Sequence, residues 1–376
     1  MSTDLFGNPL TPRAPFLLST HQKRQAMLLD YWMSEDYLKG LIAQAQDMLK
    51  YLDQLLDLAN RQGRDALMKS PRWGVCDTPL NWSTHVYPSF VEYHQGLIKQ
   101  LAQRAMESYR ASGVNDLSRM ISEFSHRWMA PEEQETFEVL LRGAEKRGFR
   151  VDRVVDRRMD LATFHWAWKE SRELFDRLPK FRVRTDFEVR SGEMPPRTGV
   201  YVSADDPNGA LQFAWTGDVG GKLGAVETLN TLGLKAVTAL GVEGAWETTA
   251  QVSTFATSAL KQGDLPGGTY GASLESTTDP QRAPYCLSRF AFESHPSRWY
   301  LVERIDGEFD DELPANGART SIRLRCEAGQ PCPQSGYWLT PAQLDSRRHF
   351  NAGDVMPSLG GGFGATIWQW DENQQA

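Results

Sequence analysis

Two cysteines near the carboxyl end, Cys326 and Cys332, have the spacing that most resembles a chemical site in this sequence. Structural zinc takes four ligands, usually from pairs of residues separated by about two to four positions. Five residues lie between these cysteines, Cys76 and Cys286 are isolated, and the nearest later histidine, His349, stands alone. The pattern disfavours zinc, and a reducing cytosol disfavours a disulfide. No histidine partner for a nucleophilic cysteine is visible, so we interpret the pair as partly buried thiols that flank a turn.

The histidines and the paired carboxylates form no recognisable catalytic set. None of the seven histidines belongs to an H-x-x-x-H or H-x-H pair, and His94 and His165 lie on or beside helical stripes, as core histidines do. Glu132 and Glu133 fit the first turn of a helix, and the aspartates at 205–206 fit an Asp-Asp-Pro-Asn-Gly turn. The two acids of a glycosidase must instead face each other across a cleft, which sequence spacing does not specify. We therefore predict no catalytic residue, no metal and no cofactor.

The stretch "GDVGGKLG" at 217–224 resembles a phosphate-binding loop without meeting its requirements. A P-loop follows the pattern G-x-x-x-x-G-K-[ST], because its backbone cradles phosphate and its hydroxyl binds magnesium. Here the outer glycines are one residue too close, and Leu223 occupies the hydroxyl position. We interpret the glycines as a flexible connection between a strand and a helix.

Two clusters combine charge with an aromatic side chain and are candidates for binding a partner. The first is an acidic run around Phe309, which we predict to be a loop. Such a run is usually solvated; alternatively, it forms an acidic patch that docks on a basic partner through an aromatic anchor. The second is a basic-aromatic cluster in an insert near the carboxyl end. The predicted partner-binding residues are Asp306, Glu308, Phe309, Asp310, Asp311 and Glu312 in the first cluster, and Arg347, Arg348, His349 and Phe350 in the second.

The composition is that of an acidic globular chain. Its 376 residues suffice for two domains, 40% are apolar and 24% charged, and the formal net charge is −7. That charge argues against nonspecific binding to nucleic acid or to anionic membranes, which requires basic patches. No window of about 18 apolar residues is present, and the amino-terminal stretch lacks the pattern of a signal peptide. We expect a cytoplasmic protein whose twelve tryptophans supply a thick core or a binding face.

Residues 1–180 have the periodicity of helices. From Ser34 to Asn60 the apolar residues recur at spacings of three and four, and Gly63 follows as a terminator. Pro131 suits the first turn of another helix, which Gly148 would end. We expect an antiparallel helical bundle, with helices at residues 34–60, 88–111, 116–128, 131–147 and 156–178.

Residues 181–376 change to short β-branched and aromatic runs separated by Gly, Pro and Asp clusters. The run "KFRVRTDFEVRSG" alternates apolar and polar residues, as a half-buried strand or hairpin does. One helix, predicted at 221–240, interrupts these runs. The expected fold class is α+β: an amino-terminal antiparallel helical bundle packed on a carboxyl-terminal, mainly antiparallel β domain with one inserted helix. The boundary lies near residue 180, and no low-complexity linker separates the halves, so we expect them to pack together.

Two segments of the second half resemble each other in sequence, and we call this similarity the internal echo. "PRTGVYVS" and "PQSGYWLT" share the pattern P-x-[ST]-G-x-[YW]-x-[ST], and downstream "GALQFAW" and "GATIWQW" share G-A-x-x-[FW]-x-W. The same ordered pair therefore appears at 196–215 and at 333–370, with a longer insert in the second copy. We interpret it as a possible duplicated β-hairpin unit, with glycines at the turns. The Gly-aromatic step beside Cys332 is then part of the scaffold.

Three stretches carry a family resemblance: "CPQSGYWLTPAQLDSRRHFNAGDVMP", the terminal "GATIWQW", and "PPRTGVYVSADDPNGALQFAWTG" with the "GKLGAVETLNTLG" that follows it. They resemble the immunity proteins of bacterial polymorphic toxins, above all immunity protein 71 and immunity protein 72, over roughly residues 190–370. The resemblance implies a cytoplasmic protein that binds and neutralises a secreted antibacterial toxin, often type VI secretion cargo, encoded by an adjacent gene. It implies no contact residue.

We therefore expect an immunity protein that occludes the active site of its toxin and is not an enzyme. An acidic, tryptophan-rich chain without a catalytic set fits a protein that only has to bind one partner tightly. Two other functions stay open: a glycan-active hydrolase, and a chaperone or adaptor that loads an effector for secretion. The hydrolase requires two carboxyl groups about 5 to 10 Å apart across an aromatic-lined cleft. An adaptor would leave the toxicity of its effector intact. The sequence leaves the oligomeric state open.

Overall fold

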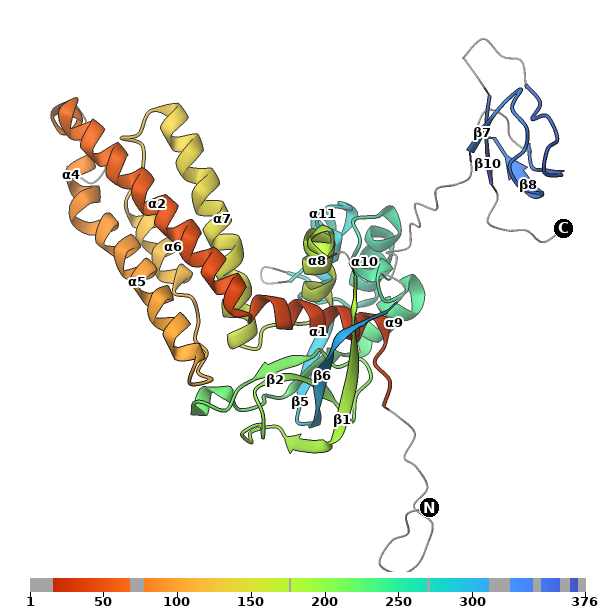
Figure 1. Cartoon of the computed structure of the whole chain (residues 1–376), viewed down its shortest axis with the longest axis horizontal. Coiled ribbons are helices and arrows are strands. Elements are labelled where there is room, and N and C mark those ends of the chain that lie inside the picture. The colour runs from red at the N-terminus through yellow and green to blue at the C-terminus, as the bar shows by residue number, and fades with distance from the viewer. Residues whose placement is uncertain are drawn as a thin grey trace, which may run out of the picture. The chain divides into compact units, whose positions relative to one another are not determined.

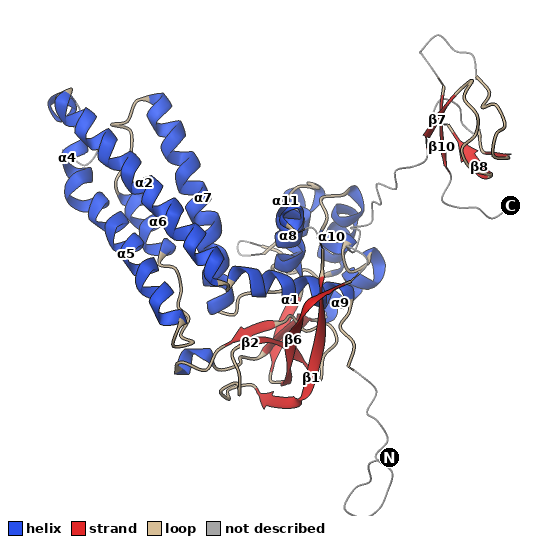
Figure 2. Cartoon of the chain, in the orientation of Figure 1, coloured by secondary structure: helices blue, strands red, loops and turns tan. Residues whose placement is uncertain are grey.

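The chain has an α+β fold with antiparallel sheets, and its amino-terminal part is helical (Figures 1 and 2). Its contacts divide it into two compact units, Met1–Asp311 and Glu312–Ala376. The boundary predicted near residue 180 falls inside the first unit, where helices and strands share a core. The structure, a computed structural model, describes residues 16–67, 78–175, 177–268, 271–310, 325–340, 346–358 and 366–370.

Figure 1 shows the helical bundle of the first unit. One continuous apolar cluster forms its core. Trp82 lies at its centre, edge-on to Trp128 and Phe137 with ring centroids 5.6 and 5.5 Å apart. Its helices are α2 (Glu35–Arg61), α3 (Arg64–Leu67), α4 (Pro79–Asn81), the π-helical turn η1 (Trp82–Val86), α5 (Tyr87–Arg104), α6 (Val114–Glu123) and α7 (Pro131–Val155).

The predicted helices of the bundle exist, but their ends differ. The helix predicted at 34–60 is confirmed as α2, and the Ser34 hydroxyl caps it by accepting a hydrogen bond from the Tyr37 N–H at 3.1 Å. The end predicted for the 131–147 helix is wrong, because α7 runs on through Gly148. A Cβ atom at Gly148 would lie 2.8 Å from the Cβ of Val114. That glycine lets α6 approach α7 closely and does not end the helix.

Helix α1 (Thr20–Trp32), which the sequence analysis missed, lies across the sheet of the first unit (Figure 1). Ser19 and Gln22 start it with a capping box: the Ser19 hydroxyl accepts from the Gln22 N–H, and the Gln22 side chain accepts from the Ser19 N–H. Helix α8 (Leu161–Ser171) packs beside α1 and continues into a 3-10 turn, η2 (Arg172–Leu174). The predicted helix at 156–178 is therefore shorter at both ends.

The sheet under α1 is antiparallel and has the strand order β1-β6-β2-β3. In β6, Tyr300 and Val302 pack toward α1, whereas Trp299 and Leu301 join a second apolar cluster. Both faces are therefore covered, which explains the uninterrupted apolar run "WYLV" in the sequence. The strands are β1 (Pro179–Arg190), which is one strand and not a hairpin, β2 (Gly199–Ser203), β3 (Gln212–Ala214) and β6 (Arg298–Phe309).

The single helix predicted at 221–240 is wrong in its first half, and further helices follow it. Val226–Leu229 forms strand β4, which pairs with β5 (Phe292–His295). The helix starts only after Asn230, whose side chain caps it by accepting from the Gly233 N–H at 3.1 Å. The buried faces of the missed helices consist largely of small residues, which resemble a loop in sequence. The elements are η3 (Val219–Gly221), α9 (Thr231–Leu240), η4 (Gly244–Trp246), α10 (Ala250–Gln262), α11 (Leu274–Thr278) and α12 (Ala283–Ser288).

The described part of the second unit is a small antiparallel sheet with the order β7-β10-β8-β9. Its core contains both cysteines, Met356 and two tryptophans, Trp338 and Trp368, with Phe350 packed against it. The Trp368 indole donates to the Pro357 carbonyl at 2.8 Å. The strands are β7 (Arg325–Glu327), β8 (Gly336–Leu339), β9 (Arg348–Phe350) and β10 (Ile367–Trp370).

The two segments of the internal echo both contain an antiparallel strand pair, β2 with β3 and β8 with β10. In each, the buried aromatic residue after the glycine donates to a carbonyl four positions earlier: Tyr201 to Arg197 at 2.6 Å, and Trp338 to Gln334 at 3.1 Å. The register differs, because Gly199 pairs with β3 whereas Gly336 pairs with β9 of the insert. The two segments therefore share a strand pair and an aromatic hydrogen bond but differ in register, and in the second β9 lies between β8 and β10 along the chain.

We expect Gly148→Ala to lower the free energy of unfolding by about 1 kcal/mol, because an overpacking cost of about 2 kcal/mol exceeds a helix-propensity gain of roughly 1 kcal/mol. Gly143→Ala in the same helix is the matched control. Its Cβ would lie 3.6 Å from the flexible Gln44 side chain, so it should raise stability by up to about 1 kcal/mol. Urea unfolding measures both. Stabilisation by both variants would contradict the close approach of α6.

Candidate functional site

The acidic cluster predicted to bind a partner begins on a strand and not on a loop. Asp306, Glu308 and Phe309 lie at the end of β6, and Gly307 has the left-handed φ of 75° that allows the strand to bend there. The Asp310 N–H donates to the Leu178 carbonyl at 2.8 Å, which holds the end of this strand beside β1. The predicted residues Asp311 and Glu312 lie outside the described residues.

Lysines from other elements pair with two of the described carboxylates of this cluster. Lys23 of α1 lies 2.5 Å from Asp310, and Lys180 of β1 lies 3.4 Å from Glu308. Exposed pairs of this kind contribute little to stability, but they offset much of the local negative charge. The strand end is therefore a surface of mixed charge with Phe309 at its centre.

Phe309 stands at the edge of a groove of about 540 Å³, which we call the aromatic groove. Phe309 is 38% exposed, and the Arg177 guanidinium lies 5.9 Å from its ring centroid. Tyr31 and Phe175 meet edge-on at 5.3 Å and form another wall. The groove is lined by the apolar or aromatic residues Met27, Tyr31, Phe175, Pro179 and Phe309 and by the polar residues Asp30, Ser34, Asp36, Arg177 and Arg304.

Asp30 places an acidic group in the wall of this groove. Burial raises the pKa of its carboxyl above the ordinary value, the nearby Arg304 opposes the shift, and Asp306 adds to it. A carboxylate that loses water without gaining an equivalent partner destabilises the fold. Asp30 is therefore a candidate functional residue, because shifted carboxyl groups that line a cavity recur at functional sites.

The basic-aromatic cluster predicted in the insert forms part of the second unit's sheet. Arg347 directly precedes β9, and its guanidinium lies 3.9 Å from the Tyr337 ring centroid. His349, on β9, meets the same ring edge-on at 5.2 Å. Arg347, Arg348 and His349 are exposed. Phe350 instead packs on Trp368 at 5.0 Å and belongs to the core. The exposed members lie in a different unit from Phe309, so each cluster is a separate candidate surface.

The cysteine pair of the second unit has thiols directed at backbone carbonyls. Cys326 and Cys332 are both buried. The Cys326 thiol lies 3.4 Å from the Pro331 carbonyl oxygen, and the Cys332 thiol lies 3.1 Å from that of Gln334. Within the part of the chain that the structure describes, no three His, Cys, Asp or Glu side chains are grouped as metal ligands.

The adjacent carboxylates that the sequence analysis considered are engaged in structural ion pairs. Glu133 receives two hydrogen bonds from Arg64, at 2.7 and 2.9 Å, which hold the pKa of its carboxyl below the ordinary value. Asp205 receives the Arg298 guanidinium, which likewise holds its pKa low. These carboxylates bridge elements of the fold and do not face each other across a cleft.

His295 faces two acceptors. Its Nδ1 lies 3.1 Å from the Pro296 carbonyl oxygen and its Nε2 lies 3.2 Å from the Asp206 carboxylate. Only the protonated imidazole donates from both nitrogens. The contact with Pro296, reinforced by Asp206, accordingly raises the pKa of His295 above the ordinary value. With both nitrogens engaged, this histidine is not placed to act as a general base.

The sequence analysis missed Asp30, Tyr31 and Phe175 as site residues. Asp30 and Tyr31 belong to α1, which was not predicted, although "STHQ" at 19–22 has the pattern of a capping box. Phe175 falls within the helix predicted at 156–178, but the observed helix ends before it. The capping box was therefore the one local signal that could have led to this wall of the groove.

Comparison of the chain with protein-family models, with curated proteins and with solved structures gave no match. Among the residues described here, no helix combines the length and the apolar character needed to cross a bilayer.

We expect Asp30→Asn to raise the free energy of unfolding at pH 7. A carboxyl whose pKa is raised in the folded state binds its proton more tightly there, so ionisation destabilises the fold. The gain should be full above the raised pKa and should vanish as the pH falls below about 3.9, where both states are protonated. Chemical unfolding of both proteins across this range tests it. A constant difference at all pH values would contradict a titrating origin.

For His295 we expect a pKa above 6.5 in an NMR titration of its ring protons. Because the folded-state pKa is raised, the stabilisation is fully present below the unfolded value and is lost as the pH rises through the folded value. Asp206→Asn should move the pKa down toward the ordinary value. A pKa that is unaffected by this substitution would show that the carboxylate does not contribute.

Proposed function

We propose that this chain is an immunity protein, which binds a cognate secreted antibacterial toxin and neutralises it by covering the toxin's active site. The observation that carries the proposal is the partly exposed Phe309 at the edge of the aromatic groove, beside a strand end of mixed charge. Binding surfaces of proteins combine an apolar, aromatic centre with a polar rim, and aromatic residues and arginine dominate their energetics. The resemblance of residues 190–370 to toxin-immunity proteins supports the same function.

The groove favours a partner that inserts an apolar side chain flanked by charged groups. Met27, Tyr31 and Phe175 contribute apolar lining, and Arg177, Arg304, Asp30 and Asp36 contribute charged lining. Lys23 and Lys180 already pair with Asp310 and Glu308, so these carboxylates have little charge left to attract a partner. We therefore expect the apolar contact in the groove to contribute more to the binding energy than these charges do. Complementary charges at the rim would then increase the rate of association and its specificity.

The test is coexpression of the chain with the toxin encoded by the adjacent gene. The proposal requires cell survival and copurification of the two proteins. Copurification with a toxin that stays active in the complex would instead indicate an adaptor that loads the effector. If neither protection nor a complex is found, the immunity function is refuted.

We expect Phe309→Ala to weaken the complex by at least about tenfold, corresponding to about 1.4 kcal/mol, because it removes the anchor at the groove edge. Leu274→Ala is the matched control, since Leu274 is 57% exposed on α11 and does not line the groove. Calorimetry or surface plasmon resonance measures both affinities. Equal affinities for the two variants would place the toxin contact elsewhere.

A glycan-active hydrolase is the second candidate, and one observation favours it. Asp30 is a carboxyl with a raised pKa in an aromatic-walled groove, as the general acid of a glycosidase must be. Its neighbour in the lining, Asp36, has a side chain that is 94% exposed and lies 3.6 Å from Lys39. Hydrolysis of a glycan that is lost in Asp30→Asn would establish this function. Full retention of toxin binding in the same variant would separate the two functions.

A further inference from the structure

A second cleft of the first unit, about 660 Å³ in volume, lies beside the glycine-rich stretch at 217–224. The segment after α5, the end of α7 and the loop after β3 supply its walls. It shares no lining residue with the aromatic groove. We call it the arginine cleft, after its lining residues Arg110, Arg157 and Arg158, which stand beside Tyr109 and Trp215.

Arg157 is a half-buried cation with only neutral partners. Its guanidinium donates to the carbonyl oxygens of Gly220, at 2.6 Å, and of Lys222, and it lies 5.6 Å from the Trp215 ring centroid. Burial lowers its pKa. No ion pair joins it to a carboxylate within the described residues. Buried charges are normally paired, because removing a cation from water costs several kcal/mol.

Arg104 adds a second such cation directly behind the cleft. It is 7% exposed, donates to the Met33 carbonyl at 2.8 Å and lies 3.9 Å from the ring centroid of Tyr109. Its Nη2 is buried and has no acceptor among the described residues. Arg110 is exposed at the rim and, in the same part of the chain, also lacks an ion pair. Arg104 and Arg157 therefore stack on Tyr109 and Trp215 with neutral hydrogen-bond partners, and Arg110 lines the same cleft. The opposing charges at the cleft are Asp156, which acts on Arg157, and Asp218, which interacts with Arg110.

The carboxylates of the cleft are already engaged. Asp156 lies 3.1 Å from Arg158. Asp218 accepts from the Gly220 N–H at 2.8 Å, from the Trp215 indole at 3.1 Å and from a serine hydroxyl. Burial raises the pKa of Asp218, but these hydrogen bonds hold it below the ordinary value. Asp218 thus takes up the Gly220 N–H, the backbone donor around which the glycine-rich stretch would otherwise offer an anion a cradle.

Backbone strain is concentrated at the same place. Within the described chain, Glu107 and Arg157 are the non-glycine residues with positive φ, at 52° and 56°. Each such conformation costs roughly 1–2 kcal/mol. Arg157 lines the cleft, and the Glu107 carbonyl accepts from the Gly217 N–H at 3.1 Å. Strain of this kind is retained where the surrounding structure serves a ligand or a switch.

We propose that the arginine cleft binds a phosphate oxyanion, held by the guanidinium groups of Arg110 and Arg157 against the ring of Tyr109. A guanidinium remains charged at all relevant pH values and presents parallel donors that match phosphate oxygens. Because Asp218 fills the backbone cradle, the arginine side chains bind the phosphate, and the glycine-rich stretch does not act as a P-loop. This site goes beyond toxin binding and does not depend on it. The phosphate bound there is either free or part of a nucleotide, and in both cases its oxygens accept hydrogen bonds from the guanidinium groups.

Isothermal titration of the full chain with pyrophosphate, inorganic phosphate and ADP at constant ionic strength tests the proposal. Pyrophosphate is expected to bind, and Arg110→Gln should weaken this binding by at least about tenfold. Arg119→Gln is the matched control: Arg119 lies on α6, its side chain is 66% exposed, and it does not line the cleft. Its substitution should leave the affinity within about twofold.

The ADP titration identifies the source of the phosphate. Binding of ADP about tenfold tighter than that of pyrophosphate indicates a nucleotide whose base stacks on an aromatic wall. Equal or weaker binding of ADP indicates free phosphate. Absence of pyrophosphate binding at millimolar concentration overturns the proposal, as does an equal loss in the Arg110 and Arg119 variants. Circular dichroism of each variant verifies that it is folded.

Discussion

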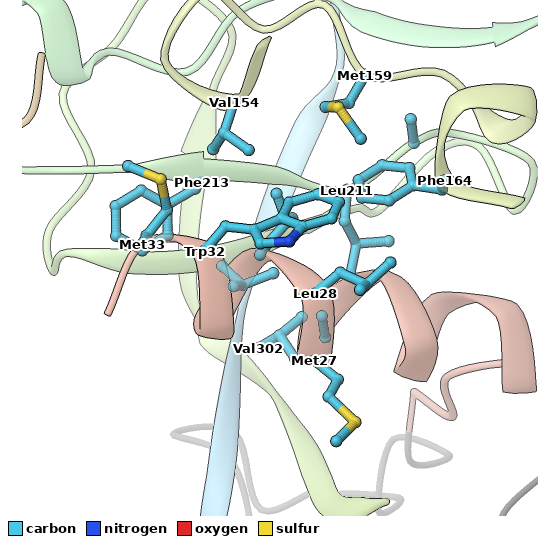
Figure 3. Close-up of a cluster of buried hydrophobic side chains, with 14 of the residues drawn as sticks. Met27, Leu28, Trp32, Met33, Val154, Met159, Phe164, Leu211, Phe213 and Val302 are labelled. Carbon is cyan, nitrogen blue, oxygen red and sulfur yellow. The ribbon is translucent and has the colours of Figure 1, made fainter. Parts of the chain in front are cut away.

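The burial of Trp32 is the constraint that joins the helices of the first unit to its sheet. Trp32 is fully buried at the end of α1, stacked on Phe164 of α8 at 6.5 Å and surrounded by residues of α7 and the sheet (Figure 3). Truncating such a side chain typically costs about 3 to 5 kcal/mol. Since α2 begins at Glu35, three residues beyond Trp32, the same packing sets the direction of the bundle. The position of α1 in turn creates the aromatic groove, because Asp30 and Tyr31, which immediately precede Trp32, line it.

The charges of this acidic chain are distributed unevenly between the aromatic groove and the arginine cleft. At the aromatic groove, lysines offset the carboxylates of the β6 end, and one carboxyl, Asp30, is desolvated. At the arginine cleft the carboxylates have their own donors, and the guanidinium groups of Arg104 and Arg157 have only neutral partners. Uncompensated charges of opposite sign therefore occur at separate places of one unit. The net charge of −7 predicts neither the desolvated carboxyl of the aromatic groove nor the guanidinium groups of the arginine cleft, since it sums over the whole chain.

Local patterns predicted the parts of the fold that local forces control. The apolar stripe of α2, with Ser34 as its cap, and the alternation of β1 were visible in the sequence, because periodicity and capping depend on near neighbours. Gly148 was misinterpreted for the opposite reason. Its role is to admit Val114 of another helix at van der Waals distance, and a glycine in a sequence does not reveal what approaches it. Likewise, α10 buries small residues that give no strong apolar stripe.

The amino-acid order alone predicted the α+β fold class, which the structure confirms, and it singled out Phe309 as an aromatic residue among charges. It did not reveal the partners of Phe309, since Tyr31 and Phe175 reach the same groove from distant positions in the chain. Nor did it show that Asp218 fills the cradle of the glycine-rich stretch while Arg157 is left with neutral partners. These features arise from packing between elements, whose side chains meet only after the helices and the sheet have docked. Hydrophobic burial drives that docking, and it is nondirectional, so the pattern of apolar residues does not specify which polar groups it brings together.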